Sequence, residues 1–76
     1  MKAYTDYPFT ALGDVSGQEA PIREVKVHAY DGDKYCVIEV ERRVEQIKAG
    51  YLTATRGGPP LTQRQLRALP RGEERS

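Results

Sequence analysis

The chain has 76 residues, a formal net charge of +1 and one cysteine, which indicates one small domain without an internal disulfide. No apolar run approaches the roughly 20 residues of a membrane-spanning helix and no apolar signal segment opens the chain, so we expect a cytoplasmic protein with no membrane partner. A core this small gains from a shared surface, which makes a homodimer an open alternative.

The first segment, residues 3–12, is aromatic and has the composition of a β-strand. Tyr7 and Phe9 would share one face of such a strand, since side chains alternate along it. Pro8 cannot donate to a neighbouring strand, so we expect an edge strand or an interruption there. Residues 13–21 are rich in Gly, Ser, Pro and acidic residues and predict a loop.

Residues 22–30 and 34–41 predict the central β-hairpin of the fold. Apolar residues alternate on both sides of an Asp31-Gly32 turn signal, which is typical of hairpins. A two-residue turn, or a four-residue loop with the same register, collects these side chains on one face, whereas a slip by one residue separates them. This register pairs Val27 with Cys36 and Val25 with Ile38, and it places His28 opposite Tyr35 on the other face.

Residues 41–50 fit both a helix and a strand. Apolar residues recur at helical spacing with Gly50 as a stop, and an alternating pattern over the same residues fits a strand. A hairpin alone is not stable in water. We therefore favour a tight turn over 41–43, a strand over 44–48, a short turn at Ala49–Gly50 and a last strand over 51–55.

The remaining residues predict a short helix on a flexible connection. Residues 56–61 form a Gly/Pro linker, and Thr62 with Gln65 has the spacing of a capping box. Leu61 and Leu66 would form the accompanying hydrophobic staple, and Pro70 ends the helix. The predicted organisation is a β-domain over 1–55, a linker over 56–61, a helix over 63–69 within the segment 62–69, and a disordered tail over 70–76.

The chain offers no residue set for catalysis or metal binding. Cys36 and His28 fall on opposite faces of the predicted hairpin, so they would not form a nucleophile pair or share a metal. The acidic residues around Gly32 lack the acidic ligand twelve positions on that a calcium loop needs. No glycine-rich phosphate loop is present. We therefore expect no enzyme activity, no metal and no cofactor.

Two short motifs resemble the SH3 family. Ala3-Tyr4-Thr5-Asp6-Tyr7 resembles the family's opening Ala-Leu-Tyr-Asp-Tyr, and Lys48-Ala49-Gly50-Tyr51-Leu52 stands where the family has a short turn with a tyrosine before its last strand. The resemblance covers residues 3–55. It implies a mainly all-β fold, a small SH3-like barrel of about five short strands, with Tyr7 and Tyr51 at the positions of a peptide-binding groove. The family's proline-binding groove relies on a tryptophan, which this chain lacks.

Two functions are consistent with these observations. The first is a non-enzymatic protein-interaction module with an unidentified protein partner. The second is a nucleic-acid-binding accessory protein that uses the basic stretch 42–71, with Tyr51 for stacking. The candidate binding surface comprises aromatic, basic and helical apolar residues: Tyr7, His28, Tyr35, Tyr51, Arg42, Arg43, Lys48, Leu66 and Leu69.

Overall fold

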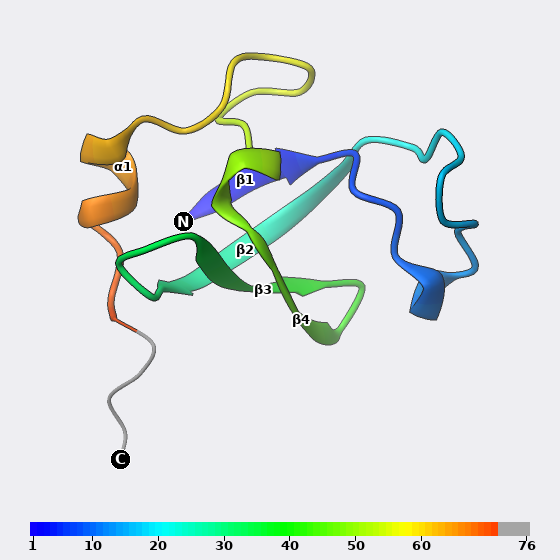
Figure 1. Ribbon diagram of the computed structural model, residues 1–76, viewed down its shortest axis with the longest axis horizontal. Helices are drawn as coiled ribbons and strands as arrows, with labels where there is room; N and C mark the ends of the chain where they lie inside the picture. The colour runs from blue at the N-terminus through cyan, green and yellow to red at the C-terminus, as the bar shows by residue number, and fades with distance from the viewer. Residues whose placement is uncertain (72–76) are drawn as a thin grey trace.

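The computed structural model describes residues 1–71 and is mainly β, as the sequence predicts. Four strands form one antiparallel sheet in the order β1-β2-β3-β4. Three short helical segments follow or interrupt them, and the C-terminal arm, residues 56–71, lies at one end of the sheet (Figure 1). The elements are β1 (Lys2–Thr5), η1 (Thr10–Leu12), β2 (Arg23–Tyr30), β3 (Tyr35–Val40), β4 (Arg43–Lys48), η2 (Ala49–Tyr51) and α1 (Gln63–Arg67).

The predicted hairpin is β2–β3, but its predicted register is wrong. Val27 pairs with Ile38 rather than with Cys36, and a bulge follows between Val27 and Ala29. The loop is longer than two residues because the Asp31 carboxylate accepts hydrogen bonds from the backbone N–H groups of Asp33, Lys34 and Tyr35. His28 therefore does not face Tyr35.

The buried face of the hairpin is nevertheless the predicted one. Moving from Cys36 to Ile38 is a shift by an even number of residues, which leaves every side chain on its original face. The five apolar residues of the predicted face are all at most 3% exposed: Val25, Val27, Cys36, Ile38 and Val40. The bulge additionally lets the consecutive residues Ala29 and Tyr30 both be buried.

The β3–β4 hairpin settles the ambiguity over residues 41–50 in favour of a strand. Glu41 and Arg42 have φ angles of 49° and 69°, which a two-residue hairpin turn of the mirror-image type requires. Val44 is 69% exposed, so the helical apolar pattern that includes it is not a buried face. The strand begins at Arg43, one residue before the predicted start.

The expectation of about five strands is wrong, because the segment 51–55 does not form one. The chain turns through η2, and only Thr53 then bridges β1, by paired 2.8 Å hydrogen bonds between the backbones of Tyr4 and Thr53. Leu52 is fully buried beside this bridge. Thr53 also bridges Pro60, which has no N–H to extend a ladder.

The arm packs against the sheet. Leu61, Leu66 and Leu69 belong to the same core cluster as the strand residues. The capping box is confirmed: Thr62 Oγ1 accepts from the Gln65 N–H at 3.2 Å, and Gln65 Oε1 accepts from the Thr62 N–H at 2.8 Å.

The helix of the arm ends earlier than predicted, at Arg67. Pro70 and Arg71 open the predicted tail and lie against β2, where the Tyr30 N–H donates to the Pro70 carbonyl at 2.8 Å. Residues 72–76 of that tail lie outside the described residues.

Candidate functional site

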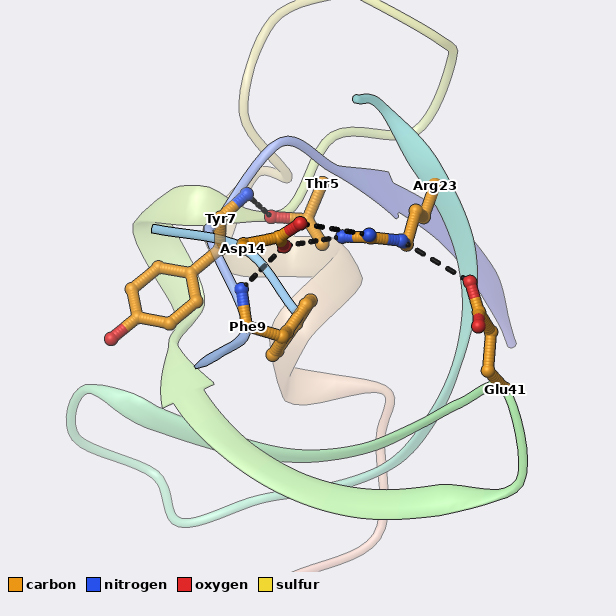
Figure 2. A network of polar contacts seen from close by, with 6 residues as sticks. All are labelled: Thr5, Tyr7, Phe9, Asp14, Arg23 and Glu41. Atoms are coloured by element: carbon orange, nitrogen blue, oxygen red, sulfur yellow. Dashed lines mark hydrogen bonds and ion pairs between the residues drawn. The ribbon is translucent and has the colours of Figure 1, made fainter. Parts of the chain in front are cut away.

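The loop over residues 6–22 is held against β2 by a carboxylate–guanidinium pair. Arg23 donates to both Asp14 oxygens, at 2.7 and 3.0 Å, and its Nε lies 3.2 Å from Glu41 in the β3–β4 turn (Figure 2). Asp14 also accepts the Phe9 N–H at 2.7 Å. The side chains of Asp14 and Arg23 are 10% and 15% exposed, so this pair is well shielded from water.

These contacts fix the part of the loop between Phe9 and Asp14 relative to β2. The Arg23 hydrogen bond, followed by the Phe9 N–H, lowers the pKa of Asp14 below its ordinary value of 3.8. Asp14 is therefore ionised at neutral pH, and a bidentate pair with an arginine is the most directional ion pair available to it. The segment just before Phe9, which carries Tyr7, therefore has a defined position.

Tyr7 and Tyr51 form a pair of packed rings. Their centroids lie 4.9 Å apart in an edge-to-face arrangement, and Phe9 packs on Tyr7 at 5.3 Å with its own ring buried. Figure 2 shows the Tyr7 ring directed away from the Asp14–Arg23 pair. Tyr51, on η2, is 46% exposed, which leaves an aromatic surface open to solvent.

Tyr51 lines three hollows in the surface, of which the smallest, about 160 Å³, lies beside Thr53 and Gly57, and the two larger ones are grooves. The first groove, about 610 Å³, lies between the loop and β4, and its lining includes Tyr7, Ser16, Gln18, Glu45 and Tyr51. The second groove, about 490 Å³, lies between η2 and the arm, and its lining includes Lys34, Lys48, Tyr51, Leu61 and Leu66. Aromatic residues beside concave, partly apolar surface are typical of binding sites for small molecules and peptides.

A further hollow of about 490 Å³ lies over the ends of β1, β2 and β3. Lys2 in its wall pairs with Glu24 at 3.5 Å, and Glu41 pairs with Arg23. Its three basic and three acidic residues carry no net charge. It contains no aromatic residue, so we place the candidate site at Tyr51 instead.

The structure brings together only some of the predicted surface residues. Tyr7 and Tyr51 meet, and Lys48 lines the groove beside Tyr51. Arg42 and Arg43 lie at the β3–β4 turn, away from the arm (Figure 1).

Leu66 and Leu69, which the sequence placed on the candidate binding surface, are buried rather than exposed. They are 4% and 9% exposed, because they complete the core of their own chain. Leu66 nevertheless contributes to the floor of the second groove.

His28 and Tyr35 do not join Tyr51. His28 Nε2 lies 3.1 Å from Glu39 on the outer face of the sheet, and Lys34 Nζ lies 6.0 Å from the centre of the Tyr35 ring. Among the described residues, the aromatic rings of the predicted surface that pack together are those of Tyr7 and Tyr51.

The sequence did not indicate Asp14, Arg23 or Lys34 as residues of the site. A useful signal was that Arg23 shares a strand face with the apolar residues Val25 and Val27, since a shielded guanidinium needs an acidic partner. Which acidic residue pairs with Arg23 depends on how the loop folds back onto β2. The local sequence pattern does not contain this information.

Cys36 and His28 lie on opposite faces of the hairpin, as predicted. Cys36 is fully buried, and burial, followed by the charge of Asp31, raises the pKa of its thiol to about 11. The thiolate that nucleophilic or metal chemistry requires is thus disfavoured. Among residues 1–71 no three His, Cys, Asp or Glu side chains gather as metal ligands would.

No helix within residues 1–71 has the length and apolarity needed to cross a membrane. Comparisons of the chain with protein-family models, with curated proteins and with solved structures found no match.

Proposed function

We propose that this chain is a non-enzymatic protein-interaction module that binds an extended segment of a partner protein across Tyr51. The observation that carries the proposal is the Tyr7–Tyr51 ring pair, in which Tyr51 is exposed and has a groove on either side. Tyrosine is enriched at binding surfaces because a rigid, amphipathic ring supplies contact area and a polar group together.

The order of the elements supports an SH3-like barrel as the scaffold. A strand, a long loop, two hairpins and a short 3-10 turn follow one another in the order that the SH3 resemblance implies. The bridge between Tyr4 and Thr53 carries the chain after β4 back to β1. In this scaffold Tyr7 and Tyr51 would stand at the peptide groove, and Tyr51 would have to take over contacts that the family gives to tryptophan.

The distribution of basic residues favours a protein ligand over a nucleic acid. Arg43 and the α1 residues Arg64 and Arg67 lie at different ends of the molecule (Figure 1). Arg56 donates to the Ile22 carbonyl at 2.8 Å and lies 5.1 Å above the Tyr4 ring, so it serves the fold. Nucleic-acid binding usually needs cations gathered along one track.

The experiment is a selection of peptides from a random peptide library displayed on phage, using the full-length chain as bait. We expect related peptides to be enriched by the native protein and lost with Tyr51→Ala. Loss of one aromatic anchor costs about 2 kcal/mol or more, which is roughly 30-fold in affinity.

His28→Ala is the matched control, because His28 lies on the outer face of the sheet, away from Tyr51. It should select the same peptides as the native chain. Failure of the native chain to enrich any peptide, or equal losses in the two variants, would overturn the proposal. A concentration-dependent dimer that only Tyr51→Ala dissociates would identify the partner segment as part of a second copy.

A further inference from the structure

We infer that the bound segment carries an acidic side chain that lies between Lys34 and Lys48 in the second groove. This inference rests on the proposed function and adds the chemistry and the direction of the ligand. Three parts of the chain build this groove: the β2–β3 loop, the end of β4 with η2, and the arm.

The fold places the two lysines on the same rim. The Ala49 N–H, just after Lys48, donates to the Lys34 carbonyl at 2.7 Å and ties the loop to the start of η2. Lys48 is also the strand partner of Tyr35, the residue after Lys34. Both lysines are exposed and both line the groove, and the Lys34 ammonium lies 6.0 Å from the ring centre of Tyr35, the strand partner of Lys48.

The charge of this rim is not neutralised within the described part of the chain. Residues 1–71 contain no ion pair to either Lys34 or Lys48, in contrast to Lys2, which pairs with Glu24. The only acidic residue in the wall is Asp33, so two cations face one anion. An acidic side chain of a ligand in the second groove would neutralise the remaining positive charge of the two lysines.

The first groove has the opposite charge. Its only charged residue is Glu45, half-buried on β4. The two grooves meet at Tyr51, so a segment that crosses the ring would meet a negative surface on the loop side and a positive surface on the arm side. Charge complementarity of this kind sets orientation and selectivity more than it adds affinity. The acidic end of the ligand therefore lies toward the arm.

The walls of the second groove favour a peptide over a phosphate backbone. Its floor includes Tyr30, Leu61 and Leu66, which are all at most 7% exposed and present apolar surface. Two lysines beside an apolar floor suit one carboxylate next to an apolar side chain. A nucleic acid would need several phosphate contacts in a row, which a groove of this size does not provide.

The test compares peptides selected from the same phage-displayed library by three full-length proteins. The native chain should enrich peptides with Asp or Glu, and the variant K34E/K48E should enrich Lys or Arg in their place. R42E/R43E is the matched control, since it changes the net charge equally at the β3–β4 turn, outside both grooves. It should keep the native preference.

A synthetic peptide from the native pool should bind K34E/K48E about tenfold or more weakly, the loss expected when an attractive charge pair becomes repulsive. If K34E/K48E fails to fold, K34Q/K48Q serves the same purpose and should abolish the acidic enrichment.

Identical pools from the native chain and K34E/K48E would overturn this inference and leave the proposed function standing. No enrichment by the native chain would overturn both. Binding of an oligothymidylate that K34E/K48E abolishes, with no acidic peptide selected, would assign the lysines to nucleic acid and overturn the inference.

Discussion

Replacement of Leu66 by alanine tests whether the C-terminal arm is part of the folded domain. Leu66 is 4% exposed and packs in the same core cluster as the sheet residues. Truncating a buried leucine costs about 2–5 kcal/mol, and we expect about 3 kcal/mol because a short helix can relax partly into the space. A domain of 76 residues has a free energy of unfolding of about 4–11 kcal/mol. The variant would thus lose a large share of its stability.

The assay is urea denaturation followed by circular dichroism, with thermal unfolding alongside. For a domain of this size a loss of about 3 kcal/mol lowers Tm by roughly 12–24 °C. The denaturant slope should stay constant if the folded state remains compact. Arg64→Ala is the control, since Arg64 is exposed on the same helix and its removal should change stability little. A change below about 0.5 kcal/mol in Leu66→Ala, within the range of surface substitutions, would refute the assignment of the arm to the core.

Three further predictions concern the cap, the loop and the thiol. Thr62→Ala removes the capping box and should cost about 1 kcal/mol in the same urea assay; an unchanged midpoint would show that the cap contributes nothing. The Arg23 hydrogen bond lowers the pKa of Asp14 in the folded chain below 3.8, the value in the unfolded chain. The ionised Asp14 therefore stabilises the fold fully at pH values above 3.8, and this stabilisation is lost as the pH falls through the lower pKa of the folded chain. Asp14→Asn should therefore lower Tm at neutral pH and flatten its fall in acid, whereas Glu19→Gln should keep the native curve; parallel curves for Asp14→Asn and the native chain would contradict this. Cys36 should resist Ellman's reagent at pH 8 until urea unfolds the chain, since its pKa is about 11; rapid labelling of the native protein would contradict its burial.

The pattern of apolar residues predicted which side chains are buried better than it predicted which strands pair. Val25, Val27 and Ile38 are in the core because a strand with one buried face must alternate. Their register depended on the loop, where the Asp31 carboxylate binds successive N–H groups, and on a bulge after Val27. Short-range sequence patterns specify faces, whereas loop length is decided by hydrogen bonds that the patterns do not contain.

The expected last strand was wrong for a related reason. Residues 51–55 have β-prone side chains, yet a 3-10 turn over Ala49–Tyr51 and the contact of Thr53 with Pro60 leave room for one bridge only. Within 51–55 only Leu52 is buried, and Thr53 makes the bridge to β1. The composition of this segment did not indicate that the arm would occupy the other side of Thr53.

The candidate site shows the same division between local and distant information. Tyr7 and Tyr51 could be named from the sequence through their place in the SH3 resemblance, and they meet at 4.9 Å. Lys34 could not be named from the sequence, because Lys48, which shares the groove rim with it, lies at the other end of the β3–β4 hairpin in the sequence. The hydrogen bond between Ala49 and the Lys34 carbonyl, which brings them together, is a long-range contact.

Folding and recognition share the arm. Leu66 belongs to the core cluster and also lines the second groove, so the surface that would bind a ligand exists only while the arm is docked. A ligand that binds only the folded chain stabilises it by about 2.7 kcal/mol at a hundred times its Kd, close to the cost estimated for Leu66→Ala. Docking of the arm and occupation of the groove therefore favour each other, and a change that loosens the arm weakens binding without touching Lys34 or Lys48.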